Sequence, residues 1–232
     1  DAQGRFFIEH PIELFAPLVN FLRAKRCQTA RAAPVLPPIF DEKRKQDDFN
    51  RMVEYFGMTL GMYPVQIDTI VGNPDTVTVS DDRMVAAKEW ATIDIKQQGH
   101  KRVINSFEVT IIDAERIQIG WANPKNTELG NNGSGVGDVS NTISLDFIRG
   151  GIIIGGEFLE INGLELKGTR TVVRSEEFGS TWFVDDLLVA SLDPKEEDEM
   201  AVKIPSSYNT KNKKPTISVK GQIQITDIAY QI

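Results

Sequence analysis

Two kinds of hydrophobic pattern divide the chain. Before about residue 63, apolar residues recur at helical spacing and form one face on each of two expected helices. The first face consists of Leu14, Leu18, Phe21 and Leu22, and the second of Phe49, Met52, Val53 and Phe56. From residue 76 onward, short alternating runs are separated by Gly, Pro, Asn and Asp, as is typical of β-strands. The pattern predicts a helical part at residues 1–71, a linker at 72–75 and an all-β part at 76–232.

The clearest alternation lies between Phe107 and Trp121. Phe107, Val109 and Ile111 alternate with polar residues, and Ile117 and Ile119 do the same after Asp113–Glu115. We therefore expect two strands joined as a β-hairpin by residues 113–115. Other strands are expected at residues 77–79, 93–95, 143–145, 152–154, 172–173, 187–192 and 217–225. Such strands predict an antiparallel sandwich with a core of Trp121, Phe107, Leu145, Trp182 and Leu188.

Composition narrows the class of protein. The chain has 232 residues, 41% of them hydrophobic, which is enough for a sizeable core. Its formal charge of −7 argues against nucleic acid, whose backbone is bound by clustered Lys and Arg. No apolar run is long enough to span a membrane, and the single cysteine, Cys27, fits a reducing compartment. We expect an intracellular, cytoplasmic protein; an organelle stays open because the chain starts at Asp1 without a methionine.

The helical part contains an ordered set of short motifs. A strand at residues 5–9 precedes the turn His10–Pro11, a helix ending in Asn20–Arg23 and a helix ending in Glu54–Gly57. This order resembles the second half of a BTB domain of the potassium-channel tetramerisation (T1, KCTD-like) type, whose first half is absent here. The resemblance implies self-association or binding of cullin-3. The candidate association residues are Phe6, Glu13, Phe15 and Arg23.

The β part resembles a SPRY domain, most closely the ryanodine-receptor-like version. The segments that carry the resemblance are residues 107–109, 119–122, 128–130, 135–138, 145–146 and 182–193. Asp185 stands where the family has a glycine, and the usual hairpin after Asp193 is replaced by the acidic run Pro194–Glu199. The resemblance implies a peptide-binding sandwich whose end loops choose the partner. The expected fold class is an α+β BTB/T1-like half domain followed by an all-β SPRY-type antiparallel β-sandwich.

Loops at the end of a rigid sandwich are the expected binding surface. They comprise residues 123–137, 162–163 and 175–181. The candidate partner-binding residues in them are Asn123, Lys125, Asn126, Glu128, Asn131, Asn132, Asn162, Glu176, Glu177, Phe178 and Thr181.

The chemical motifs have structural explanations that we favour. The glycine-rich loop Gly130–Gly137 lacks the Gly-Lys-Ser/Thr ending of a phosphate loop, so we expect a flexible binding-rim loop. Asp185–Asp186 are expected to accept backbone hydrogen bonds at a strand start rather than to act as an acid/base pair or a calcium site. His10 and His100 with one cysteine cannot form a standard zinc set. We assign no catalytic, cofactor-binding or metal-binding residue.

Two functions remain open. The first is a non-enzymatic interaction module, serving as a substrate-recruiting adaptor of a cullin-3 ubiquitin ligase in which the SPRY part chooses the partner. The alternative is a structural subunit of a large stable assembly. Both make other proteins the partners, without nucleic acid or membrane insertion, and self-association through the BTB-like part makes an oligomer. Co-purification with cullin-3 separates the two.

Overall fold

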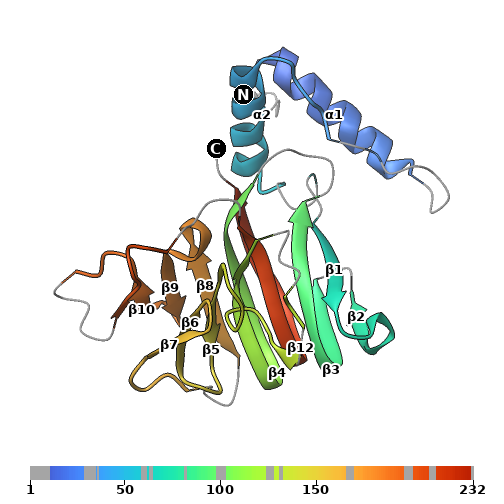
Figure 1. Ribbon diagram of the computed structural model, residues 1–232. Coiled ribbons are helices and arrows are strands. Elements are labelled where there is room, and N and C mark those ends of the chain that lie inside the picture. The colour runs from blue at the N-terminus through green and yellow to red at the C-terminus, as the bar shows by residue number, and fades with distance from the viewer. Residues whose placement is uncertain are drawn as a thin grey trace. The chain divides into compact units, whose positions relative to one another are not determined.

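The computed structural model describes most of the chain (Figure 1). The described residues are 11–28, 35, 37–58, 62, 65–80, 83–97, 103–123, 128–130, 133–165, 170–195, 201–208 and 213–230. Two compact units are present. A helical unit comprises residues 1–65 with 97–101 and 232, and a β unit comprises residues 66–96 with 102–231.

The helical unit contains the two expected helices, α1 (Ile12–Arg26) and α2 (Lys43–Tyr55). Their apolar faces form a shared core. It consists of Leu14, Leu18, Phe21, Phe49, Met52, Val53 and Met62. Leu22 is 39% exposed and lies at the margin of this face. Neither described helix is long and apolar enough to cross a membrane. The expected strand at residues 5–9 lies outside the described residues, and two helices alone do not show a BTB domain.

The β unit joins its described strands into one hydrogen-bonded network. They are β1 (Val65–Val71), β2 (Val77–Val79), β3 (Met84–Gln97), β4 (Ile104–Ala122), β5 (Thr142–Asp146), β6 (Gly151–Ile154), β7 (Glu157–Glu160), β8 (Thr171–Glu176), β9 (Thr181–Val184), β10 (Leu187–Ser191), β11 (Val202–Lys203) and β12 (Lys214–Tyr230). Two 3₁₀ turns, η1 (Pro74–Thr76) and η3 (Glu177–Gly179), lie between strands. The short strands predicted from alternation are confirmed.

Three long strands, β3, β12 and β4, form the middle of the unit (Figure 1). Residues 107–111 of β4 pair with β8, while residues 118–122 pair with β5. Two layers result: the β8 layer continues through β9, β10 and β11, and the β5 layer through β6 and β7. β10 and β11 run parallel, whereas β12 is antiparallel to β3 and β4, and β4 is antiparallel to β5 and β8. The pairs β2–β3, β5–β6, β6–β7, β8–β9 and β9–β10 are also antiparallel.

The central strands fold back on themselves between the two layers. The rings of Phe107 and Trp121 are 5.1 Å apart, although both belong to β4. Fourteen residues of straight strand would separate them by about 46 Å. Register shifts between β12 and β4 at Lys220/Gly221 and Gln222/Ile223 mark the bend. The two layers therefore share continuous strands and enclose the core between them.

The expected hairpin at residues 113–115 is wrong. The two halves of β4 do not pair with each other, because β12 pairs along both of them. Their remaining hydrogen-bonding edges are taken by β8 and β5. The halves instead face each other across the core. Alternation predicted which side chains are buried, but not which strand edges are paired.

The core contains both tryptophans that the sequence places there. Trp121 and Trp182 are fully buried, and each indole N–H has a partner. Trp121 Nε1 donates to Ser175 Oγ at 2.8 Å, and Trp182 Nε1 donates to the Gly179 carbonyl at 2.8 Å. Phe107 and Leu145 are buried as expected. Leu188 is only half-buried, because an irregularity in β10 between Leu188 and Ala190 places Val189 in the core instead.

Residues 72–75, expected as a linker, follow β1 inside the β unit and include the first two residues of η1. Asn73 Oδ1 accepts a hydrogen bond from the Asp75 backbone N–H at 3.1 Å and shapes this turn. The strand before it, β1, is half-buried along most of its length. Exposed positions along it are few and do not alternate regularly with the half-buried ones.

The bend predicts a strict requirement for glycine at position 221. Gly221 has φ +142°, and a Cβ there would collide with the Asp113 carbonyl and lie 2.5 Å from Ala114 Cα. We expect Gly221→Ala to lower the free energy of unfolding by about 2–4 kcal/mol through backbone strain and overpacking. Gly133 is the control, because it has φ +77° but open space around its Cβ position. Urea denaturation should show a loss of only about 1 kcal/mol for Gly133→Ala; equal losses in both variants would contradict the bend.

Candidate functional site

A loop at residues 128–140 covers the outer, polar face of the β5 layer. Trp121 and Ile143 of this layer face the core, so by alternation Gln118, Ser144 and Ser218 face outward. These three polar side chains are nevertheless fully buried. Gly135 and Gly137 make this possible, since a Cβ at either position would collide with Gln118 or Ser144. The loop therefore lies directly on the sheet.

The loop is held in place by its own backbone. The N–H groups of three consecutive residues donate to side chains: Gly135 to Asp138 Oδ2 at 2.9 Å, Val136 to Ser218 Oγ at 2.9 Å and Gly137 to Thr142 Oγ1 at 2.8 Å. The loop expected to be flexible thus has three successive backbone hydrogen bonds among its described residues. These N–H groups are also engaged within the protein, which argues against a phosphate cradle.

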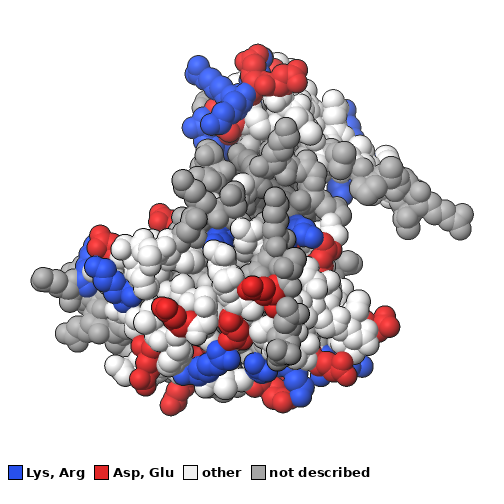
Figure 2. Space-filling view, viewed as in Figure 1, with Lys and Arg blue, Asp and Glu red and all other residues white. Residues whose placement is uncertain are grey.

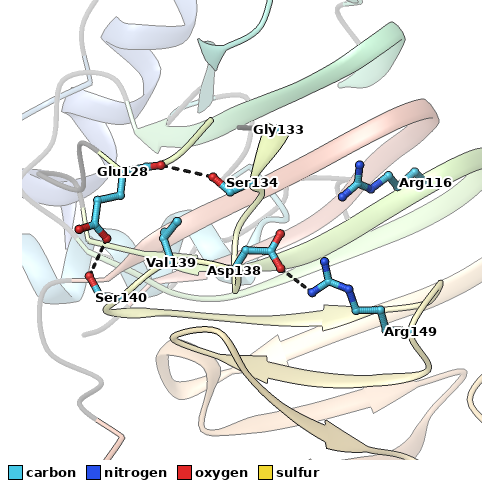
Figure 3. A pocket seen from close by; sticks show the side chains of 8 residues that line it. All are labelled: Arg116, Glu128, Gly133, Ser134, Asp138, Val139, Ser140 and Arg149. Atoms are coloured by element: carbon cyan, nitrogen blue, oxygen red, sulfur yellow. Dashed lines mark hydrogen bonds and ion pairs between the residues drawn. The ribbon is translucent and has the colours of Figure 1, made fainter. Parts of the chain in front are cut away.

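An open hollow of about 560 Å³ lies beside this loop (Figure 3). Its lining residues are Arg116, Glu128, Gly133, Ser134, Asp138, Val139, Ser140 and Arg149. Figure 3 shows Arg116 and Arg149 on one side and Glu128 on the other. Val139 is the one large apolar residue of this lining, so the hollow suits polar ligand groups.

Both arginines have a fixed position in the hollow. Arg149 Nη1 donates to Asp138 Oδ1, and its Nε lies 3.6 Å from Asp146 Oδ2. The Arg116 guanidinium stacks 4.1 Å from the centroid of the Trp90 ring. Stacking and ion pairing both restrict the rotamers of a long side chain before any ligand arrives.

Asp138 stays ionised beneath the loop. Burial acts to raise its pKa, but hydrogen bonds from the Gly135 N–H, Arg149 and Gln118 outweigh burial and hold the pKa below its ordinary value. The Gln118 amide also donates to Asp146 Oδ2 at 2.9 Å, which links the two carboxylates that hold Arg149.

A second loop, around η3, contains four of the predicted binding residues. Glu176 pairs with Arg174 at 3.0 Å, and Glu177 Oε2 accepts from Ser180 Oγ at 3.3 Å. Glu177 and Phe178 both have positive φ, at 48° and 60°, which costs conformational energy in a non-glycine residue. Thr181 begins β9 immediately afterwards.

Contacts with the core hold the strained Phe178 in this conformation. Its ring packs on Trp121 with 5.6 Å between centroids, and its carbonyl accepts from Tyr208 Oη at 3.1 Å. Lys213 Nζ lies over the Tyr208 ring at 5.3 Å and donates to the Asn141 carbonyl. Asn141 directly follows the 128–140 loop, so a continuous set of contacts joins the two loops.

The structure brings together some of the sequence-predicted residues. Glu128 lines the hollow and accepts from Ser140 Oγ at 2.9 Å, and Asn123 lies just after β4 near the Trp121 end. Asn162 lines a separate small pocket against the β9–β10 hairpin. Lys125, Asn126, Asn131 and Asn132 lie outside the described residues.

Of the BTB-type association residues, Glu13 and Arg23 are exposed on α1. Phe15 is half-buried, and its ring lies 6.5 Å from that of Phe56. Phe6 lies outside the described residues. The structure thus leaves two charged side chains of this set accessible.

Sequence reasoning missed Arg116, Arg149, Tyr208 and Lys213. The spacing of Asp146 and Arg149 was a weak local signal, since Asp146 ends β5 and Arg149 lies in the turn that follows. Arg116 comes from the bend of β4, 33 residues earlier in the chain, so only the pairing of β4 with β5 explains its presence.

Asp185 and Asp186 form the turn of the β9–β10 hairpin. Both have positive φ, at 48° and 63°, which suits a two-residue hairpin turn. Asp185 Oδ1 accepts from the Val172 N–H at 2.9 Å, and Asp186 pairs with Arg174 at 3.3 Å. Asp185 thus accepts a backbone hydrogen bond as expected, whereas Asp186 pairs with an arginine, and both residues lie in a turn rather than at a strand start.

A buried ion pair holds the start of β12. Lys214 Nζ pairs with the buried Asp94, whose Oδ1 also accepts from Thr216 Oγ1 at 3.1 Å. Glu196–Glu199 and Lys211 lie outside the described residues. His10 and His100 also lie outside them, whereas Cys27 is described and exposed.

Charges of both signs are mixed on the described surface of the β unit shown in Figure 2. Lys and Arg alternate there with Asp and Glu along the lower edge. This face does not present the broad basic stripe that nucleic-acid binding requires.

Three solved structures are similar to the chain in fold. The SPRY domain of human HERC1 matches at 10% identity and TM-score 0.41, covering 67% of this chain and 96% of that domain. The TRIM65 PSpry domain matches at 14% and 0.45, covering 83% and 98%. The carbohydrate-binding module CBM66 from Bacillus subtilis matches at 10% and 0.42, covering 72% and 95%.

No family model and no curated protein matches the chain. The three structures are among the solved structures that match the chain. With TM-scores below 0.5, the alignments assign neither a family nor a ligand to the chain.

The hydrogen bond from Tyr208 to the Phe178 carbonyl predicts the effect of removing the Tyr208 hydroxyl. Tyr208→Phe keeps the ring beneath Lys213 but removes the donor to the Phe178 carbonyl. We expect a loss of about 1 kcal/mol in the free energy of unfolding, because the carbonyl loses a partly buried partner. Hydrogen exchange should become faster at residues 177–180 and stay unchanged in β12. Faster exchange throughout the β unit would contradict a local role.

The lowered pKa of Lys213 predicts that the free energy of unfolding depends on pH. Burial lowers its pKa to about 8, against an ordinary value of 10.5. Between these values the unfolded chain binds more protons than the folded one, so this residue makes stability rise with pH. Below pH 8 the cost of burying the charged ammonium is fully present.

Lys213→Met removes this titration. We expect the stability of the wild type relative to Lys213→Met to increase between pH 7.5 and pH 9.5, as measured by urea denaturation. A difference that is independent of pH would show that Lys213 titrates normally.

Proposed function

We propose that the chain is a non-enzymatic protein-interaction module that binds its partner through the 128–140 and 175–181 loops. One observation carries this proposal: side chains and main chain of the sandwich hold both loops in fixed conformations. Ser218 and Thr142 anchor the first loop, while Trp121 and Tyr208 anchor the second. Loops that are ordered before binding lose less conformational entropy when a partner binds.

The chemistry of the hollow supports binding over catalysis. Its two carboxylates already have structural partners: Asp138 holds Arg149, and Glu128 accepts from Ser140. A general base must be able to reach a substrate proton, and a nucleophile needs such a base beside it. The described lining residues contain no such pair. We therefore propose that the chain binds a partner without catalysing a reaction.

The finer role we propose is that of a substrate-recruiting adaptor for a cullin-3 ubiquitin ligase, with the helical unit supplying self-association or cullin contacts. The exposed Glu13 and Arg23 on α1 are its candidate contacts. A second candidate, a structural subunit of a stable assembly, is favoured by exposed apolar side chains on the helical unit. Ile12, Ile39 and Tyr55 are 81%, 70% and 78% exposed, which suits burial against other subunits.

Affinity purification of the tagged full chain from its native cells tests the function. The interaction proposal predicts co-purification of specific proteins at constant stoichiometry, measured by quantitative mass spectrometry. Cullin-3 among them supports the adaptor; a fixed, salt-resistant set of subunits without cullin-3 supports the structural role. Recovery of the chain alone at all salt concentrations would contradict both.

Charge reversal in the two loops should break this co-purification. Glu128→Lys and Glu177→Lys alter exposed side chains and should each reduce recovery of the partner at least fivefold with little change in melting temperature. Glu157→Lys on β7 is the matched control at an exposed position outside both loops. Equal loss with the control variant would place the binding surface elsewhere.

A further inference from the structure

We propose that the hollow beside the 128–140 loop receives an acidic side chain of the protein partner, whose carboxylate pairs with Arg116 and Arg149. This inference rests on the proposed interaction function and specifies the chemistry of its partner. It follows from how the charges around the hollow are already used.

Arg116 has no carboxylate partner in the described part of the chain. Its guanidinium stacks on Trp90, and the neighbouring acid, Glu115, pairs instead with Lys220 at 2.7 Å. Stacking uses the face of a guanidinium and leaves the N–H groups at its edge available for hydrogen bonds. A planar carboxylate is the group that such an edge binds best.

Arg149 supplies a second set of donors that is already oriented. Asp138 and Asp146 hold it, yet 43% of its side chain remains exposed. A guanidinium carries five N–H donors, so two carboxylate contacts do not exhaust it. Figure 3 shows both arginines on the same side of the hollow. An incoming carboxylate therefore meets donors whose rotamers are fixed before binding.

The charge balance of the lining favours a single negative charge. Arg116 and Arg149 contribute two positive charges, and Glu128 and Asp138 contribute two negative ones. A doubly charged phosphate would be repelled by both acids, whereas a carboxylate opposite Glu128 adds one charge to a neutral lining. The hollow is open and bordered by loops, which suits a side chain presented by a protein surface.

Peptide selection on the full chain tests this inference. The probe is a phage-displayed library of random dodecapeptides, selected on the immobilised wild type at low salt. We expect the enriched peptides to share one Asp or Glu position. The best peptide and its Gln-substituted version are then synthesised, and fluorescence anisotropy measures their affinity for the wild type and for Arg116→Gln.

A double-mutant cycle gives the decisive result. Substituting the peptide acid by Gln, or Arg116 by Gln, should each weaken binding at least tenfold, while the Gln peptide should bind both proteins equally. Arg149→Gln should act as Arg116→Gln does. Arg51→Gln, an exposed arginine that pairs with Asp48 on α2, is the control and should leave affinity unchanged.

Three outcomes would overturn the inference: no enriched peptide, enriched peptides without a shared acidic position, or coupling below twofold in the cycle. Tighter binding of a phosphoserine version than of the glutamate peptide would also overturn it, because the neutral lining would then tolerate a doubly charged group. Stoichiometric co-purification that resists Arg116→Gln would leave the interaction function standing while removing the acidic contact. The two proposals therefore fail separately.

Discussion

The close approach of Gly221 to Asp113 and Ala114 is the constraint on which the rest of the β unit depends. It lets β12 and β4 turn together, so that each strand belongs to both layers. Without the turn, the rings of Phe107 and Trp121 would lie at opposite ends of a long strand and could not share a core. The core therefore arises from folding one pair of strands over, rather than from docking two independent sheets.

The folding back of β4 and β12 also positions the 128–140 and 175–181 loops, which form the rim of the sandwich. Trp121 lies one residue before the end of β4, where Ser175 of β8 and Phe178 of η3 contact the indole. On the other face of the β5 layer, the 128–140 loop covers buried polar side chains, and Ser218 and Thr142 accept hydrogen bonds from its backbone N–H groups. Both loops thus contribute to stability and to the shape of the surface.

Local patterns predicted the elements well, because periodicity directly reports which side of a helix or strand is buried. The faces of α1 and α2, most strands, and the burial of Trp121 and Trp182 followed from such patterns. Strand pairing did not follow from local patterns, because it depends on residues far apart in the chain. Residues 113–115 form a bend rather than a hairpin turn, and Gly221 of β12 lies against them. For the candidate site, the sequence predicted only that it lies in loops, not which side chains line it. Arg116 and Arg149 line the same hollow because β4 pairs with β5, and alternation does not indicate which strands pair.

The most direct test of the account is the distance between Phe107 and Trp121, measured by nuclear Overhauser effects between their ring protons in a selectively labelled full chain. Ring centroids 5.1 Å apart predict strong cross-peaks. Their absence, together with cross-peaks from Phe107 to residues of β12 and β8 alone, would mean that β4 does not fold back. The two-layer core and the rim built upon it would then be contradicted.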